Sequence, residues 1–204
     1  MSIQKKVSDY YTTKVKTFGC TPSGVDWSSK ESQILRFHKL LELVPKDASA
    51  FSLLDYGCGY GALADYMIKN YDHFRYIGFD ISQEMLANAQ HQHHRNEHEW
   101  INVIPSNLKV DYLVASGIFN VKLDIPKKQW EKYVLDTLQK FDSITNKGFA
   151  FNILTTYSDK EHQKERLYYA NPEWYFSFCK QNYSPMVSLI HDYPLYEFTI
   201  IVKK

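Results

Sequence analysis

The sequence predicts an α/β fold, with a doubly wound and mostly parallel sheet that has helices on both faces. Short apolar runs alternate with segments of helical periodicity over most of the 204 residues, as they do in repeated strand–helix units. The first of these runs ends in three glycines at alternate positions, Gly57, Gly59 and Gly61, directly before a helix. A chain of this length can bury a core of its own, so one sheet-based domain is expected.

The N-terminal residues 1–27 are polar and aromatic. Residues 2–18 could form a helix that ends at Gly19, and the Pro and Gly residues after it indicate a loop. Because polar residues and glycines separate the aromatic side chains, we expect no stable core element here. Residues 1–27 are therefore predicted to form a mobile lid or cap, and residues 28–204 the main domain.

A helix is predicted to begin at Ser28, because Ser28 and Glu31 have the spacing of a capping box. Its apolar residues recur at helical spacing, at Ile34, Phe37, Leu41 and Val44. Pro45 ends this pattern. The first strand follows at residues 51–55, before the glycine loop and a helix over residues 62–69.

Further strand–helix units follow the first. The second strand covers residues 74–80, and Ser82 is placed to cap a helix that runs to Ala89. The next strands are expected at residues 100–104, 111–115 and 148–155. Two more helices are expected over residues 127–141 and 172–180. The second of these begins at Pro172, since proline is preorganised for the first helical turn.

The C-terminal segment has the pattern of a β-hairpin. Two apolar runs, residues 186–191 and 196–202, are separated by a short turn at Pro194. The sheet should therefore contain seven strands, of which the hairpin contributes one antiparallel strand.

The composition narrows the choice of partners. Lys and Arg total 24 against 23 Asp and Glu, a net charge of +1, so no overall basic excess exists for a nucleic acid or an anionic membrane. No apolar window reaches the length of a membrane span, and no apolar leader follows Lys5 and Lys6, which predicts a cytoplasmic protein. The three cysteines are scattered without a C-x-x-C pair, which argues against disulfides and a cysteine-based zinc site.

The glycine loop fits two kinds of ligand. Gly57, Gly59 and Ala62 match the G-x-G-x-x-G/A fingerprint of dinucleotide-binding folds, whereas Asp55 with the three glycines matches D-x-G-x-G-x-G, a loop that holds S-adenosylmethionine. Asp80 ends the second strand, where a carboxylate can accept the ribose hydroxyls of either ligand. Asp55 discriminates better, because a carboxylate suits an ammonium group and is a poor neighbour for a pyrophosphate.

At these residues, and in the D-x-S-x-x-M-L-x-x-A pattern that begins at Asp80, the chain resembles the class I S-adenosylmethionine-dependent methyltransferases. The resemblance runs from the helix at Ser28 to the C-terminal hairpin. It implies a Rossmann-like fold and an enzyme that transfers a methyl group from S-adenosylmethionine to an oxygen or nitrogen of a small molecule. The residues that match the family's cofactor site are Asp55, Gly57, Cys58, Gly59, Gly61, Asp80, Ile81, Met85 and Ser116.

Two cofactor contacts remain open at the level of the sequence. The family often places an acid at the end of the third strand to bind the adenine amino group, and this chain has none there; Asn102, Ser106 or a backbone carbonyl could substitute. Arg36, on the first core helix, could pair with the methionine carboxylate of the cofactor or stand as a solvated charge on that helix.

The acceptor side offers several candidates. His191 and Asp192 follow the strand at residues 186–191 and should fall on the cofactor side of the sheet, so they are candidates for a general base together with Tyr157 and His38. His191 could equally pack at a sheet edge, and His38 in the core or at its boundary. The candidates for contact with the substrate are Tyr11, Trp27, Asn120 and Lys122. Asn120 could instead bond to its own backbone in a turn.

No physiological metal is predicted. His94 and His98 would lie one turn apart on a helix, but their surroundings are polar and offer no evident partner residues that would hold the two rings in place by hydrogen bonds. Metal-dependent catechol-type methyltransferases carry acidic ligands after their fourth and fifth strands. Here the corresponding strands, expected at residues 111–115 and 148–155, end in Ser-Gly-Ile and Leu-Thr-Thr, so these ligands are absent.

Other function classes stay open. An RNA or protein methyltransferase would need an open basic rim, which the even charge balance disfavours. In addition, no N-P-P-Y type motif follows the strand expected at residues 111–115. A nonenzymatic cofactor-binding module would have a filled acceptor pocket. An NAD-linked oxidoreductase would need a second, catalytic domain.

Overall fold

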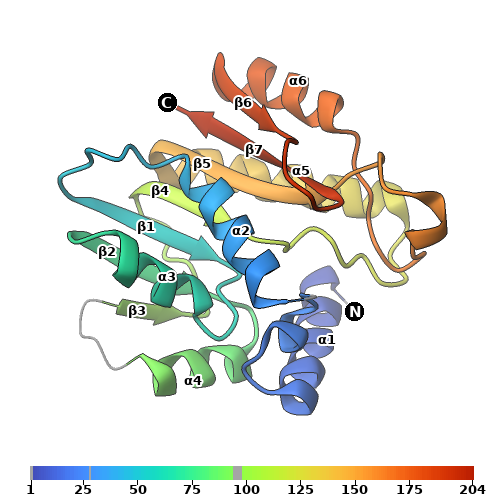
Figure 1. Ribbon diagram of the computed structural model, residues 1–204, viewed down its shortest axis with the longest axis horizontal. Helices are drawn as coiled ribbons and strands as arrows, with labels where there is room; N and C mark the ends of the chain where they lie inside the picture. Colours follow the sequence, from blue (N-terminus) through green and yellow to red (C-terminus); the bar gives the residue numbers. More distant parts are fainter. Residues whose placement is uncertain (1, 28, 94–97) are drawn as a thin grey trace.

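The computed structural model describes residues 2–27, 29–93 and 98–204. In these residues seven strands form one sheet in the order β3-β2-β1-β4-β5-β7-β6 (Figure 1). The strands are β1 Phe51–Tyr56, β2 Phe74–Phe79, β3 His98–Ile101, β4 Val110–Ala115, β5 Thr145–Leu154, β6 Met186–Ile190 and β7 Glu197–Lys203. Neighbours from β3 to β5 are parallel, and β7 is antiparallel to both β5 and β6. The prediction of a mostly parallel seven-stranded sheet with one antiparallel hairpin strand is confirmed.

Helices cover both faces of this sheet. They are α1 Ile3–Phe18, α2 Lys30–Leu41, α3 Ala62–Asn70, α4 Gln83–Gln92, α5 Lys127–Ile144 and α6 Pro172–Asn182, with short 3₁₀ helices η1 Pro22–Val25 and η2 Lys160–His162. Successive side chains of β1 point to opposite faces: Leu53 packs with the apolar residues of α2 and α3, and Leu54 with those of α5 and α6. Each face therefore has its own apolar core.

The helix expected over residues 2–18 is present as α1 and ends at Gly19. Its regularity corrects the expectation that the polar residues of this segment exclude a stable element. The Ser2 side chain accepts a hydrogen bond from the backbone N–H of Lys5, and the Gly19 N–H donates to the Val15 carbonyl. Val7 and Val15 are buried on one side of α1, so its polar side chains can remain on the other.

The start of α2 lies one residue later than predicted. Ser29 is the N-cap: its hydroxyl accepts from the backbone N–H of Ser32 (3.1 Å), and its own N–H donates to the Ser32 hydroxyl (3.3 Å). Ser28, the predicted cap, lies outside the described residues. The helix ends at Leu41, and Ile34, predicted on the apolar face, is exposed.

The third strand is displaced from its predicted position. β3 covers residues 98–101 because it pairs with β2, from Tyr76 opposite His98 to Phe79 opposite Ile101. At the end of β2 the Asp80 N–H still donates to the Ile101 carbonyl (3.2 Å), and residues beyond Ile101 have no strand to pair with. His98 is thus in a strand rather than on a helix with His94, which lies outside the described residues.

Candidate functional site

The glycine loop connects β1 to α3 in a conformation that requires glycine. Gly57, Gly59 and Gly61 all have positive φ angles, a region that side chains disfavour. A Cβ atom on Gly57 would also lie 2.4 Å from the Cγ2 atom of Ile118. The N–H groups of Gly57 and Cys58 donate to the Phe79 carbonyl, which fixes the loop against the end of β2.

The Asp80 carboxylate links this loop to α4. Its two oxygens accept hydrogen bonds from the backbone N–H groups of Gly59 (2.9 Å) and Ser82 (2.8 Å). The Ser82 hydroxyl in turn caps α4 and lies 2.8 Å from the hydroxyl of Thr12 on α1. Burial raises the pKa of Asp80 to about 6, although these backbone hydrogen bonds oppose the shift.

A second carboxylate, Asp55, lies at the end of β1. It is buried, and the Tyr76 hydroxyl donates to its Oδ2 atom at 2.6 Å. Burial raises the pKa of Asp55 to about 7; the Tyr76 hydrogen bond lowers it, and the charge of Asp80 raises it further. A ligand with a positive group is therefore favoured near Asp55, because it would stabilise the ionised carboxylate.

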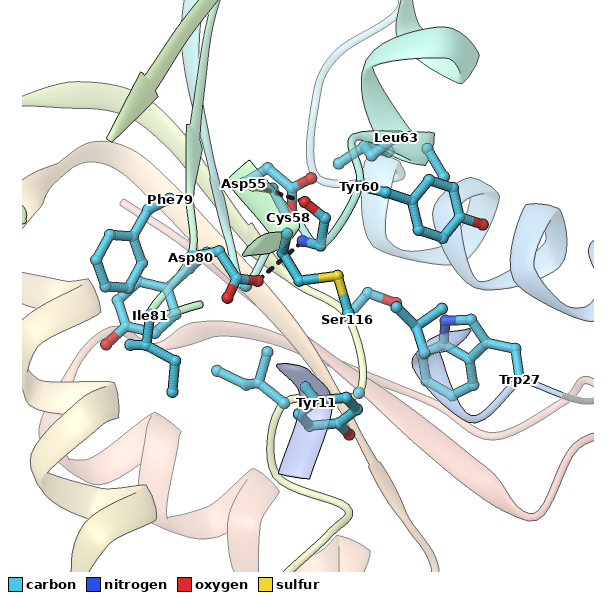
Figure 2. A pocket seen from close by; sticks show the side chains of 18 of the residues that line it. Tyr11, Trp27, Asp55, Cys58, Tyr60, Leu63, Phe79, Asp80, Ile81 and Ser116 are labelled. Atoms are coloured by element: carbon cyan, nitrogen blue, oxygen red, sulfur yellow. Dashed lines mark hydrogen bonds between the residues drawn. The ribbon is translucent and has the colours of Figure 1, made fainter. Parts of the chain in front are cut away.

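These groups line one cavity, which is partly open to solvent. Figure 2 shows Asp80 and Trp27 toward opposite ends, with Cys58 and Ser116 between them. The predicted site residues that line this cavity are Tyr11, Trp27, Asp55, Gly57, Cys58, Gly59, Asp80, Ile81, Met85 and Ser116. Gly61 shapes the turn but faces His93 and Trp100 instead.

Several lining residues carried no usable signal in the sequence. Tyr56 ends β1, and Tyr133 comes from α5, far along the chain. Gln33 and Phe37 lie one turn apart on α2, and Gln33 accepts a hydrogen bond from the Tyr60 hydroxyl (3.3 Å). Only the helical spacing on α2 could have indicated that these two residues share a face.

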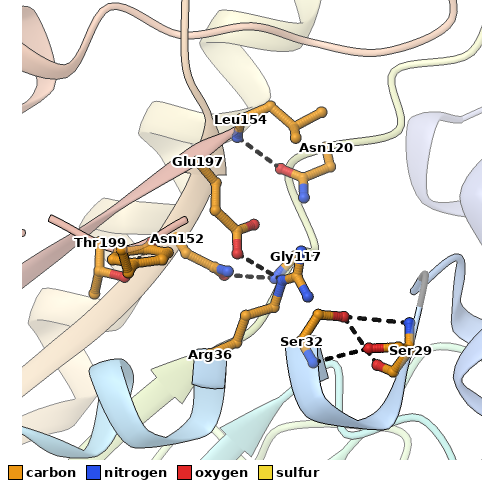
Figure 3. Close-up of polar contacts among 10 residues, drawn as sticks. Ser29, Ser32, Arg36, Gly117, Asn120, Asn152, Leu154, Glu197 and Thr199 are labelled. Carbon is orange, nitrogen blue, oxygen red and sulfur yellow. Dashed lines mark hydrogen bonds and ion pairs between the residues drawn. The ribbon is translucent and has the colours of Figure 1, made fainter. Parts of the chain in front are cut away.

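Arg36 is held in a buried ion pair, next to the cavity rather than in its lining (Figure 3). Its Nε atom lies 2.6 Å from Oε1 of Glu197 on β7, and both side chains are buried. The Trp27 ring stacks on the guanidinium, with 3.9 Å from its centroid to the Cζ atom. The reading of Arg36 as a solvated charge is wrong, because α2 packs this face against the sheet.

The two residues predicted after β4 also lie outside the lining. The Asn120 side chain is buried, and its Oδ1 accepts a hydrogen bond from the Leu154 N–H on β5 (3.1 Å, Figure 3). Its partner is therefore a neighbouring strand and not its own turn. The Lys122 ammonium donates to the Leu123 carbonyl (3.3 Å).

The candidate bases gather elsewhere, around the sheet edge. The Tyr157 hydroxyl donates to Glu173, and the His191 ring lies 5.8 Å from the Tyr157 ring, centroid to centroid. Asp192 pairs with Lys39 at 3.1 Å. His191 and Asp192 follow β6, which runs in the expected direction, but β7 inserts between β6 and β5 and moves them away from the cavity.

His38 is exposed on α2 and also lies outside the lining, so its reading as a core residue is wrong. Within the described ranges, which leave out residues 94–97, no group of three or more His, Cys, Asp or Glu could hold a metal ion. In the same ranges no helix is both long and apolar enough to cross a bilayer.

The chemistry of the cavity follows from these groups. The Asp80 end combines a fixed carboxylate with the apolar side chains of Ile81 and Met85, which suits a sugar attached to a flat base. Among the described residues, the buried Ser116 hydroxyl has no hydrogen-bond partner. It therefore offers a polar contact to a ligand at the end of β4.

Comparisons with known proteins agree with this arrangement. A family model described as a methyltransferase domain matches residues 27–184. A protein of Mycobacterium tuberculosis named as a candidate methyltransferase is 44% identical over 158 residues, which cover 77% of this chain and 95% of that protein.

Solved structures of methyltransferases share the fold. The magnesium protoporphyrin IX methyltransferase of Synechocystis, determined with bound S-adenosylmethionine, has a TM-score of 0.71 and 14% identity, and covers 100% of this chain and 98% of its own. The plantazolicin methyltransferase BpumL, with S-adenosylhomocysteine, has a TM-score of 0.60 and 12% identity over 98% and 97%.

Proposed function

Because the chain belongs to the class I S-adenosylmethionine-dependent methyltransferases, we propose that it methylates an oxygen or nitrogen atom of a small molecule. The observation that carries this proposal is the single cavity that joins the glycine loop, Asp80 and the end of β4. Its far end, at Trp27 and beyond Ser116, is where the acceptor would bind.

The residues of the cavity fit the cofactor. In our proposal the Asp80 carboxylate accepts the ribose hydroxyls, and Asp55 pairs with the ammonium of the methionine part. The bare backbone at Gly57 and Gly59 leaves room for that part to approach, while Ile81 supplies apolar contact for the base. When bound, S-adenosylmethionine supplies an electrophilic methyl group with a good leaving group.

The protein's own contribution is mainly positioning. Holding two reactants in line can contribute about 7 to 11 kcal/mol to catalysis. Of the described residues that line the cavity, none is histidine, and burial raises the pKa of both the Tyr11 hydroxyl and the Cys58 thiol. These two groups therefore remain protonated, so we assign them to packing and hydrogen bonding rather than to proton abstraction.

An RNA or protein acceptor is the second candidate. It would have to pass Trp27, which lines the acceptor end of the cavity, and the chain has no overall basic excess to attract a polyanion. A small molecule fits this cavity better.

The cofactor assignment is tested by Asp80→Ala. This variant should weaken binding of S-adenosylmethionine by about 1 to 3 kcal/mol, because the ribose loses a charged acceptor and the loop loses its link to α4. Calorimetry with S-adenosylmethionine measures this effect. Asp136→Ala, on the exposed face of α5, is the matched control and should bind normally. Tight binding of NAD without binding of S-adenosylmethionine would refute the assignment.

The affinity for the cofactor should also depend on pH through Asp55. Below its pKa of about 7 this carboxyl is protonated in the free protein, and pairing with an ammonium requires that the proton leave. The affinity should therefore rise up to about tenfold per pH unit below 7 and level off above it. Calorimetry at pH 6 in buffers of different ionisation enthalpy should detect the released proton. An equal affinity of the protein at pH 6 and pH 8 would contradict this role. Asp55→Asn should remove this dependence except for the part due to Asp80, whose pKa of about 6 lies at the lower end of the range.

The raised pKa of Asp55 also makes the stability of the fold depend on pH. The folded, ligand-free protein binds the Asp55 proton more tightly than the unfolded chain, whose carboxyl has the ordinary pKa of 3.8. Its contribution to stability is therefore largest at low pH and falls as the pH rises from about 4 to 7. Bound cofactor would offset this loss.

A further inference from the structure

A buried polar side chain near the carboxyl end of β5 supports the acceptor end of the cavity from behind. Asn152 has no exposed surface, and its Oδ1 atom accepts a hydrogen bond from the Gly117 N–H at 2.7 Å (Figure 3). Gly117 follows β4 and lines the cavity, whereas Asn152 lies outside the lining. Asn152 can therefore act on the cavity through the backbone of Gly117.

An asparagine departs from the pattern of this face of the sheet. Successive side chains of a strand point to opposite faces, and Ala150, two residues earlier on β5, belongs to the apolar core under α2 and α3. Asn152 lies on the same face, opposite Thr199 on β7. A buried amide is unfavourable unless it is hydrogen-bonded, so an apolar residue would suit the core better. Departures of this kind are expected where a residue serves a site.

The peptide unit between Ser116 and Gly117 needs such a support. Gly117 has a φ angle of 70°, and a glycine without a side chain changes its backbone conformation more readily than other residues. Because a trans peptide unit is planar, its C=O and N–H groups point in opposite directions. The hydrogen bond to Asn152 therefore fixes the direction of the Ser116 carbonyl as well as that of the Gly117 N–H.

The ring of Trp27 rests on the same backbone. A Cβ atom on Gly117 would lie 2.1 Å from the Cη2 atom of Trp27, so the ring occupies the space that a side chain would take. The ring also stacks on the Arg36 guanidinium, with 3.9 Å from its centroid to the Cζ atom. A shift of the Gly117 backbone would therefore reach both Trp27 and Ser116, the two residues that mark the acceptor end.

We propose that Asn152 is a positioning residue for methyl transfer, because it holds the peptide unit between Ser116 and Gly117 in the orientation that shapes the acceptor end. This inference rests on the proposed function, since it concerns the same cavity. Misplacement of a reactant by about 1 Å can cost about 100-fold in rate. The cofactor end has its own support, in the hydrogen bonds from the Gly59 and Ser82 N–H groups to Asp80.

The test is Asn152→Leu, which removes the acceptor oxygen and keeps a side chain of similar size. Exchange of the Gly117 amide hydrogen, followed by NMR, should become at least about tenfold faster, because its buried acceptor is lost. In protein labelled with 5-fluorotryptophan, the ¹⁹F signal of Trp27, assigned with Trp27→Phe, should move. The signal of Trp174, half-exposed on α6, should not. Calorimetry should give an affinity for S-adenosylmethionine within about twofold of the wild-type value.

Thr145→Val is the matched control. Thr145 is buried at the other end of β5, and its hydroxyl donates to the Phe141 carbonyl at 2.8 Å. This variant also removes one buried hydrogen bond between a side chain and the backbone, so it should lower stability to a similar extent. It should leave the Gly117 exchange rate and the Trp27 signal unchanged, because neither residue contacts this end of the strand.

The inference is wrong if Asn152→Leu leaves both the Gly117 exchange and the Trp27 signal as in the wild type, or if Thr145→Val changes them equally. If Asn152→Leu does not fold, the wild-type protein still decides. Slow exchange of its Gly117 amide supports the hydrogen bond to Asn152, whereas exchange as fast as that of an exposed amide refutes it. A wild-type protein that fails to bind S-adenosylmethionine would count against the proposed function, and the Gly117 and Trp27 measurements do not depend on that result.

Discussion

Glu197→Ala should lower the free energy of unfolding by about 3 to 5 kcal/mol, the usual effect of removing one partner of a buried ion pair. Glu197 is fully buried, and the variant would leave the Arg36 guanidinium without its counter-charge. Burial lowers the pKa of Arg36 and raises that of Glu197, while their mutual attraction opposes both shifts. Urea unfolding followed by circular dichroism measures the change.

Two controls separate this effect from a general sensitivity of the fold. Glu99→Ala breaks the exposed pair between Glu99 and Arg75 (2.8 Å) and should change stability by less than about 1 kcal/mol. The double variant Arg36→Met with Glu197→Leu removes both charges and should recover most of the loss. If Glu197→Ala is no more destabilising than Glu99→Ala, the ion pair does not hold α2 to β7.

This ion pair also explains how the C-terminal hairpin contributes to the site. Glu197 begins β7, opposite Leu154 at the end of β5. On β5, Asn152 accepts a hydrogen bond from the Gly117 N–H (2.7 Å). The hairpin thus holds Arg36, and the neighbouring strand β5 holds the backbone of Gly117. Both lie far from the glycine loop in the sequence. The acceptor end of the cavity is built from contacts between distant segments.

The cofactor end could be predicted because its chemistry is local. The three glycines and Asp55 lie in one short stretch, and Asp80 ends the next strand. Because neighbouring strands of such a sheet are parallel, their carboxyl ends lie at the same edge, and no knowledge of the remaining strand order is needed to place these residues together. Positive φ angles at the glycines are a local property too, so spacing alone indicated the loop.

The acceptor end could be predicted only in part. Trp27 and Ser116 were among the predicted residues that line the cavity, but no local pattern joins Arg36 to Glu197, because pairing across the sheet decides that contact. The direction of the strand correctly placed His191 and Asp192 at the edge of the sheet where the cavity lies. Their distance from the cavity depends on the insertion of β7 between β5 and β6, which the direction does not reveal. Strand order of this kind is a nonlocal property.

Helix α1 could swing away from the cavity if its contacts with the rest of the protein are weak. Three polar contacts tie it to later parts of the chain: Thr12 with Ser82 (2.8 Å), Tyr10 with Arg166 (2.6 Å) and Lys6 with Asp124. Only Val7 and Val15 are buried among its apolar residues. Segments with few buried apolar contacts open at low free energy. We therefore keep residues 1–27 as a proposed lid, now in the form of a hinged helix rather than an unstructured segment.

Deleting residues 1–20 should leave a folded domain, because the sheet lies after α1 and the deleted segment contributes to the apolar cores only Val7, with Ile3 and Tyr11 packed against them. The cofactor end loses Tyr11 from its wall and the link from Thr12 to Ser82. We expect S-adenosylhomocysteine to dissociate about 100-fold faster, since a lid acts on retention and positioning. Stopped-flow displacement measures this rate without a known acceptor. Trypsin should cleave after Lys14 or Lys16 in the free protein and more slowly with S-adenosylhomocysteine bound. If the deletion unfolds the protein, or if cleavage is equally slow with and without ligand, α1 is a fixed part of the core and not a lid.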